Sequence, residues 1–90
     1  MLKTLEELIT IIRQRKESSA EESYTKKLLN DKKLSVEKVK EEIAELAEAI
    51  EKNTNKVHEA ADVLYHLMVL LEANDIKIED VMDELKKRQK

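Results

Sequence analysis

Four acidic residues occur in two pairs with the same internal spacing, Glu42 with Glu45 and Glu59 with Asp62. Residues three apart in a helix lie on one face, so each pair would present two neighbouring carboxylates. If the two pairs face each other, four like charges come together, and that arrangement is unfavourable without a cation among them. The pattern therefore indicates a site for a metal ion.

Carboxylate oxygens as the only ligands favour a hard divalent ion, which here means Mg²⁺ or Mn²⁺. Mg²⁺ keeps several of its water molecules and usually meets its substrate through phosphate oxygens. The chemistry that follows is metal-assisted attack of water on a phosphoanhydride. A di-iron bundle would need Glu three residues before each ligand His, and neither His58 nor His66 has one.

The first acidic pair lies on a helix that we expect from Val36 to about Lys52, with Ser35 as its N-cap. Its buried stripe consists of apolar residues that recur by threes and fours, namely Val36, Val39, Ile43, Leu46 and Ile50. On a helical wheel Glu42 lies at the edge of this stripe, and Glu45 lies one turn further on. A glutamate-rich face in contact with water is the alternative interpretation of this helix alone.

The second acidic pair lies on a helix that we expect from Lys56 to about Ala73, with Asn55 as its N-cap. This helix is apolar on nearly every side, which is typical of a central, buried helix. Glu59, Asp62 and His66 nevertheless form one polar stripe, and no Lys or Arg follows them within the helix. Carboxylates are seldom buried unless they are paired or hold a metal. Stabilisation of the two acids by the dipole of the helix N-terminus is the alternative.

An antiparallel hairpin around residues 53–55 would bring the two acidic pairs face to face. The other predicted elements are a helix from Leu2 to about Glu17, a loop over residues 18–23, a short helix from Tyr24 to Asn30, a polar break over residues 30–33 and a last helix from Glu79 to about Lys87. We therefore expect an all-α, four- to five-helix bundle that forms a single domain over residues 1–90. So small a domain buries little surface, and we expect a homodimer with part of Leu67 to Leu71 in a two-fold interface.

The 90 residues include no Gly, no Pro and no Cys, and the formal net charge is −3. Without Gly there is no phosphate-binding loop of the Walker or dinucleotide type, and without Cys there is no disulfide or thiolate chemistry. The negative charge argues against a nucleic-acid partner. No apolar run approaches the roughly 20 residues that cross a bilayer, and the N-terminal segment is acidic where a signal peptide is apolar. We therefore expect no membrane partner and a cytoplasmic location.

The resemblance to a known family rests on several segments in the right order. They are Leu5-Glu6-Glu7-Leu8 with Arg15-Lys16, Ser23-Tyr24-Thr25 with Leu28-Leu29, Lys38-Val39 with Glu41-Glu42, the run from Glu59 to Leu67, and Asp80-Val81 with Leu85. The two acidic pairs, separated by thirteen residues, are similar to the ExxE…ExxD signature of the MazG-like, all-α nucleotide pyrophosphohydrolases. Together these segments resemble the phosphoribosyl-ATP pyrophosphatases, one family of that superfamily, over nearly the whole chain.

This resemblance implies Mg²⁺-dependent hydrolysis of phosphoribosyl-ATP to phosphoribosyl-AMP and pyrophosphate, the second step of histidine biosynthesis, by a dimeric enzyme. It implies that the metal ligands are Glu42, Glu45, Glu59 and Asp62. Glu45 is also the first candidate for orienting the attacking water. Glu41 matches the first acid of the family's acidic pair and is a second catalytic candidate, although the helical wheel points it away from the buried stripe.

Four residues are expected to contact the substrate. Arg15, Lys16 and Lys38 are candidates for phosphate contacts, because the substrate carries several negative charges. Tyr24, within its Ser-Tyr-Thr segment, is expected to shape the loop over the substrate. His66 is expected either to fix a ligand or to pack in the subunit interface.

Two other functions stay open at this stage. A housecleaning pyrophosphohydrolase that acts on (d)NTPs would use the same metal site, and only an assay of several substrates separates the two enzymes. A non-catalytic helical interaction module would show no Mg²⁺ dependence. The acids on the most apolar helix argue against that module, because packing alone does not require them.

Overall fold

The computed structural model of the protein describes residues 1–17 and 23–89. Within these ranges the chain forms five α-helices and no strand, namely α1 (Lys3–Glu17), α2 (Tyr24–Asn30), α3 (Lys32–Lys52), α4 (Lys56–Ala73) and α5 (Ile78–Arg88). The predicted all-α fold is confirmed. The loop predicted over residues 18–23 lies outside the described residues except for Ser23, whose hydroxyl caps α2 by accepting from the N–H of Lys26 at 3.1 Å.

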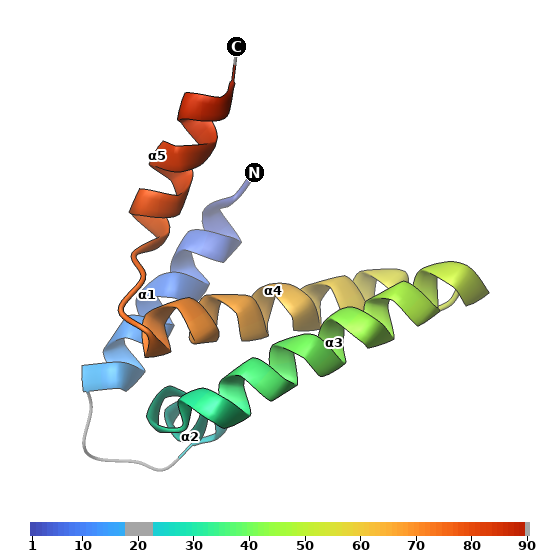
Figure 1. The fold of residues 1–90 in the computed structure, drawn as a ribbon, viewed down its shortest axis with the longest axis horizontal. Helices are drawn as coiled ribbons and strands as arrows, with labels where there is room; N and C mark the ends of the chain where they lie inside the picture. Colours follow the sequence, from blue (N-terminus) through green and yellow to red (C-terminus); the bar gives the residue numbers. More distant parts are fainter. Residues whose placement is uncertain (18–22, 90) are drawn as a thin grey trace.

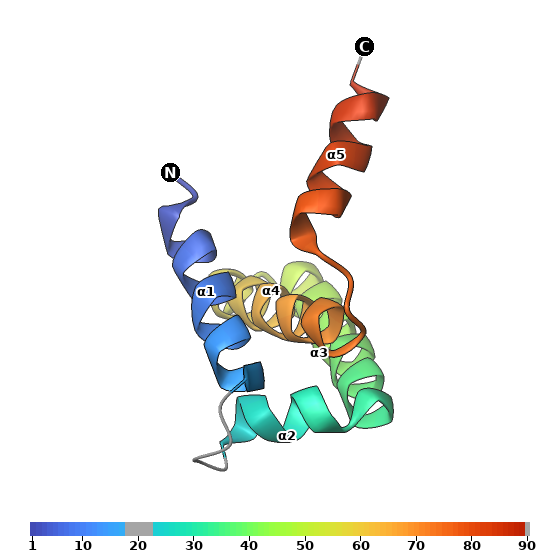
Figure 2. The same ribbon diagram turned by 90° about the vertical axis from the view of Figure 1, so that its left-hand side faces the viewer.

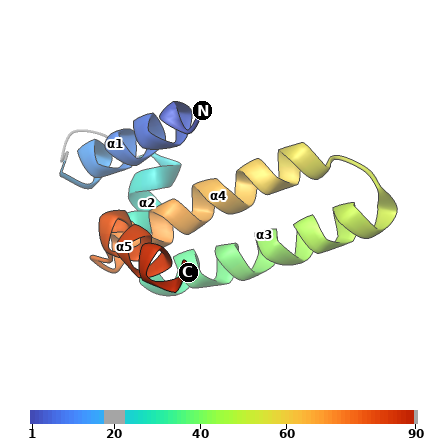
Figure 3. The same ribbon diagram turned by 90° about the horizontal axis from the view of Figure 1, so that it is seen from above.

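The two longest helices, α3 and α4, form an antiparallel hairpin and lie side by side (Figures 1 and 3). The turn that joins them needs positive φ angles, which Gly usually supplies. Here two asparagines supply them, Asn53 with φ 55° and Asn55 with φ 49°, because Asn tolerates the left-handed region better than most residues. The predicted hairpin is therefore present and places the two acidic pairs on neighbouring helices.

Two predicted helix caps differ from those observed. Helix α3 begins at Lys32 because the side chain of Asp31 accepts a hydrogen bond from the N–H of Leu34 at 3.0 Å. Ser35, the predicted cap, lies inside the helix and is 1% exposed. Asn55 does stand at the N-cap of α4, but its backbone is left-handed and its side chain makes no capping hydrogen bond there. A side chain that caps normally extends from β-region backbone.

The hydrophobic core lies where α1 and α2 meet α4. Its buried members are Ile12, Leu28, Leu29, Met68, Val69 and Ala73. Figure 2 shows α1 and α2 gathered at one end of the hairpin. The predicted interface segment from Leu67 to Leu71 therefore contributes two fully covered residues, Met68 and Val69, to the core of its own subunit.

The other end of the hairpin, near its turn, projects beyond α1, α2 and α5 (Figures 1 and 3). Large apolar side chains are exposed along both helices there, namely Ile43, Ile50, Val57 and Leu64. A third layer of helix would normally cover such residues. This exposed apolar surface is the part of the fold that the described chain does not bury by itself.

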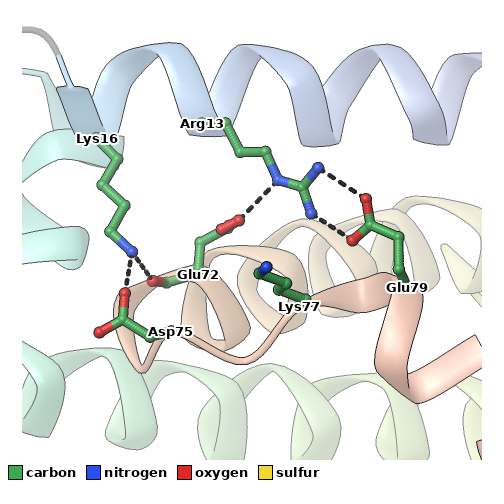
Figure 4. A pocket seen from close by; sticks show the side chains of 6 residues that line it. All are labelled: Arg13, Lys16, Glu72, Asp75, Lys77 and Glu79. Carbon is green, nitrogen blue, oxygen red and sulfur yellow. Dashed lines mark hydrogen bonds and ion pairs between the residues drawn. The ribbon is translucent and has the colours of Figure 1, made fainter.

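Helix α5 also projects away from the hairpin (Figure 1), and Figure 2 shows it standing apart from α1. Arg13 of α1 links the first turn of α5 to the rest of the fold (Figure 4). The guanidinium of Arg13 donates to both oxygens of Glu79 at 2.7 and 3.1 Å and to Glu72 at 2.8 Å. This bidentate pair lowers the pKa of Glu79 to about 2. Among the described residues, no helix combines the length and apolar character needed to cross a membrane.

Candidate active site

The acidic pairs of α3 and α4 converge on one place. Glu42 and Glu45 from α3 and Glu59 from α4 each offer a carboxylate oxygen within 4.8 Å of the others. Asp62 joins them through Glu59, since these two acids and His58 form a second group of the same dimensions. The carboxylates that the two spacings predicted to meet across the hairpin do meet, with Glu59 at the centre.

Two oxygens of this cluster are buried without a hydrogen-bond partner in the described structure, Oε2 of Glu42 and Oε2 of Glu59. Buried polar atoms are nearly always paired, so each such atom needs an explanation. Glu45, by contrast, is exposed at the same cluster. The cluster therefore has a partly buried floor formed by Glu42 and Glu59 and an open side at Glu45.

Burial and mutual repulsion both disfavour charge in this cluster. The pKa of Glu42 is raised above its ordinary value, first by burial and then by the charge of Glu45. The pKa of Glu59 is raised as well, again first by burial and then by the adjacent Glu45 carboxyl. A positive charge between these acids would offset the mutual repulsion.

A hard divalent cation fits these residues. The four acids offer carboxylate oxygens as the only kind of ligand atom. Two of these oxygens are buried without a hydrogen-bond partner among the described residues. Mg²⁺ and Mn²⁺ prefer such ligands and accept water on the open side of a site. Glu42, Glu45, Glu59 and Asp62 are therefore the residues that would hold the ion.

One neighbour of the cluster was missed by the sequence analysis. The Nε2 atom of His58 lies 3.4 Å from Oδ2 of Asp62 and 3.9 Å from Oε1 of Glu59. The side chain of His58 is 72% exposed, so it lies at the solvent-facing edge of the cluster. The signal that could have identified it is its spacing, because His58 precedes Asp62 by four residues and such pairs adjoin on a helix.

Lys38, Glu41 and Tyr24 lie beside the cluster rather than in it. The Nζ atom of Lys38 donates to Glu41 at 3.4 Å, and the carboxylate of Glu41 holds the pKa of Lys38 above its ordinary value. Glu41 is exposed and thus points outward, as the helical wheel indicated. Burial raises the pKa of the Tyr24 phenol, the charge of Lys38 opposes this rise, and the charge of Glu42 adds to it.

Tyr24 is joined to the second acidic pair by a buried histidine. Its hydroxyl lies 2.9 Å from Nε2 of His66, and Nδ1 of His66 lies 2.8 Å from the backbone carbonyl of Asp62. The ring of Tyr65 meets that of His66 edge to face, with ring centres 5.0 Å apart, and its hydroxyl is hydrogen-bonded to Thr25. Helix α2 is therefore fastened to α4 directly beside the carboxylates.

Arg15 and Lys16 are not brought to the cluster. Lys16 donates to Asp75 and to the carbonyl of Glu72, at the C-terminal end of α4 (Figure 4). Glu72 is thirteen residues from Glu59 along α4, which corresponds to about 20 Å of helix. Arg15, on the same turn of α1 as Lys16, is exposed.

Comparison with known proteins identifies the family of this chain. Residues 5–89 match the family model for phosphoribosyl-ATP pyrophosphohydrolase. A phosphoribosyl-ATP pyrophosphatase of Pyrobaculum arsenaticum is 42% identical, over 98% of this chain and 97% of that protein. One of Clostridium novyi is 45% identical, over 96% of this chain and 81% of that protein.

The chain belongs to the phosphoribosyl-ATP pyrophosphohydrolase family. The resemblance read from the sequence motifs is thereby confirmed. This family member is also similar to longer proteins, including a histidine biosynthesis bifunctional protein of Pyrococcus furiosus, at 46% identity. The chain spans 43% of that protein's length and 34% of the length of its chloroplastic counterpart in Arabidopsis thaliana.

Proposed function

We propose that this chain hydrolyses the α–β phosphoanhydride of phosphoribosyl-ATP and releases phosphoribosyl-AMP and pyrophosphate, with Mg²⁺ as cofactor and Mn²⁺ as a possible substitute. The observation that carries the proposal is the convergence of four carboxylates from α3 and α4, two of them with buried, unpartnered oxygens. The names of the relatives support the choice of substrate. The cytoplasmic location expected from the sequence stays a prediction.

The four acids would together hold the ion and orient the attacking water. Glu42, Glu59 and Asp62 lie on the more buried side of the cluster and would act as ligands. When bound, a divalent ion supplies Lewis acidity toward phosphate oxygens and a more acidic water. Glu45, on the exposed side, can both reach the ion and accept a proton from the attacking water. The step then forms one P–O bond to water and breaks the bridging P–O bond.

The basic residues proposed for phosphate contacts differ in their distance from the carboxylate cluster. Lys38 lies beside Glu42 and is the candidate for a phosphate contact at the reacting end of the substrate. Glu41 would help by holding the Lys38 ammonium in place, which is a positioning role. Arg15 and Lys16 share a turn of α1, and Lys16 contacts the C-terminal end of α4, far from the carboxylates. These two residues would therefore reach only the end of the substrate most distant from the metal.

The deciding experiment measures product release from phosphoribosyl-ATP and from a panel of dNTPs, with Mg²⁺ and with EDTA. We expect pyrophosphate from phosphoribosyl-ATP and little product from the dNTPs. Preference for a dNTP would support a housecleaning enzyme, since the carboxylate cluster itself does not select the nucleoside. Release of single phosphate would contradict cleavage at the α–β bond, and activity unchanged by EDTA would contradict the metal site.

A homodimer is part of this proposal. The exposed side chains Val36, Ile43 and Ile50 of α3 are spaced by seven residues, and so are Val57 and Leu64 of α4. Apolar residues with a seven-residue repeat are typical of helices that pack along one another. A second copy of the hairpin would cover both rows, and the proposed interface therefore runs along α3 and the first half of α4, outside the Leu67–Leu71 segment.

A further inference from the structure

The hydrogen bond between Tyr24 and His66 has a defined direction. The backbone carbonyl of Asp62 can only accept, so Nδ1 of His66, at 2.8 Å from it, carries the proton. In the neutral ring Nε2 is then an acceptor, and the hydroxyl of Tyr24, at 2.9 Å, donates to it. The proton of Tyr24 thus points into the protein, toward α4.

The phenol oxygen consequently offers lone pairs, rather than its proton, to any further partner. Burial raises the pKa of Tyr24 although Lys38 opposes the effect, so the phenol keeps its proton at neutral pH. The Tyr24 hydroxyl donates this proton to Nε2 of His66. His66 is 7% exposed, and both of its ring nitrogens are hydrogen-bonded. Tyr24 as a whole residue is 48% exposed, so a ligand can approach this side chain from solvent.

An acceptor at this position discriminates between the parts of a nucleotide. Phosphate oxygens are acceptors too, and they would pair with the ammonium of Lys38 rather than with Tyr24. Hydroxyl groups of the sugar are the donors that such an oxygen can bind. The adenosine ribose is joined directly to the α-phosphate, so it is the hydroxyl-bearing group nearest to the bond that the carboxylates would cleave.

We propose that Tyr24 accepts a hydrogen bond from a hydroxyl of the adenosine ribose, and that His66 is a positioning residue which sets this role by taking the proton of Tyr24. The inference rests on the proposed function for the orientation of the nucleotide. It assigns Tyr24 to recognition of the sugar, rather than of phosphate, and assigns His66 to specificity rather than to the chemical step.

The test uses ATP, 2′-deoxy-ATP and 3′-deoxy-ATP as competitive inhibitors of phosphoribosyl-ATP hydrolysis. For the parent protein we expect one deoxy analogue to bind about two- to tenfold more weakly than ATP, the size of one hydrogen bond. Tyr24→Phe should abolish this difference. Tyr65→Phe is the matched control, because it removes a phenol oxygen that is hydrogen-bonded to Thr25 rather than to His66, and it should keep the difference.

Two substitutions of His66 distinguish a role in positioning Tyr24 from a role in packing alone. His66→Gln can still present an acceptor near the place of Nε2 and should keep the preference for ATP. His66→Met fills the space without an acceptor and should lose the preference although Tyr24 is intact. The double variant with Tyr24→Phe should lose no more than either single variant, because both changes act on one hydrogen bond. Additive losses, or a fall in kcat alone, would overturn the proposal.

A direct measurement covers the case in which His66→Met fails to fold. In the parent protein at neutral pH, ¹⁵N chemical shifts of His66 should report a protonated Nδ1 and an unprotonated Nε2, and the opposite tautomer would overturn the inference. If the parent releases no pyrophosphate from phosphoribosyl-ATP, the proposed function fails. The three ATP forms are then compared by calorimetry with Mg²⁺, where equal affinities would overturn the sugar contact as well.

Discussion

Glu45 of α3 and Glu59 of α4 have carboxylate oxygens within 4.8 Å of each other, although thirteen residues separate them in the sequence. The two acids meet because the hairpin turn at residues 53–55 folds α4 back along α3. Neither helix alone gathers more than two of the four acids. The site therefore depends on the packing of the hairpin, and the hairpin in turn has to tolerate the repulsion between like charges.

Asp62→Asn should abolish nearly all Mg²⁺-dependent hydrolysis. A neutral amide is a poor ligand for a hard cation, whereas the shape of the side chain is kept. An ion held by these carboxylates would bind only the folded protein, so Mg²⁺ should raise the Tm of the parent much more than that of the variant. Thermal melts with Mg²⁺ and with EDTA measure this difference.

The matched control for that experiment is Glu48→Gln. Glu48 lies one turn after Glu45 on α3, is exposed and pairs with Lys52 at 2.6 Å. It should keep both the activity and the Mg²⁺-induced rise in Tm. An equal rise in the parent and in Asp62→Asn would remove Asp62 from the metal site.

Glu42→Gln should stabilise the metal-free protein at neutral pH. The pKa of Glu42 is raised in the folded state, so ionisation of Glu42 lowers the free energy of unfolding at high pH. This loss is recovered as the pH falls through the folded-state pKa toward the unfolded value of 4.5. The variant lacks this charge and should be more stable than the parent by about 1 kcal/mol at pH 8, a typical effect of one substitution. Near pH 4.5 the difference should be smaller.

Urea unfolding in EDTA at both pH values checks this prediction. Glu48→Gln again serves as the control, because its ion pair with Lys52 lowers the pKa of Glu48 and gives the opposite sign. If Glu42→Gln is less stable than the parent at pH 8, the buried carboxylate is stabilising without metal and our account of the cluster is wrong.

The sequence predicted much of this site because its signals are local. Acids three apart on a helix, and a polar stripe on an apolar helix, depend only on helical geometry. The position of Lys16 was not predictable in this way, because its partner Asp75 lies on another element and is reached only after folding. The bond between Tyr24 and His66 is of the same kind, since it joins α2 to α4.

The helix boundaries illustrate a second limit. Asp31 and Ser35 are both good N-cap residues, and each could begin α3. Helix α3 begins after Asp31, which lets Leu34 pack against the core, although the Ser35 hydroxyl is then buried without a hydrogen-bond partner among the described residues. Local propensity does not rank two such caps; tertiary packing does.

Glu79→Gln should weaken the attachment of α5 and change its pH dependence. Arg13 depresses the pKa of Glu79 to about 2, so the pair stabilises the fold above the unfolded pKa of 4.5. That stability is lost as pH falls from about 4.5 toward about 2. The Tm of the parent should therefore fall more steeply over this range than that of the variant.

Hydrogen exchange of the α5 amides at neutral pH provides the second measurement, and Glu79→Gln should exchange faster there. Glu84→Gln is the control, since Glu84 pairs with Arg88 within α5 and does not reach α1. Equal exchange in the two variants would mean that the link between Arg13 and Glu79 does not hold α5.

Ile50→Glu should convert the proposed homodimer into a monomer. Ile50 is 58% exposed in the single chain and lies in the row of α3 side chains that also includes Ile43. In a dimer this row would be covered, and a buried, unpaired carboxylate there would strongly disfavour association. Light scattering should give twice the chain mass of 10.5 kDa for the parent and the chain mass for the variant.

Lys52→Glu, an exposed change two residues further along α3, should leave the dimer intact. A parent protein that is monomeric at micromolar concentration would contradict the proposed interface, because the exposed apolar rows would then have no second copy to cover them.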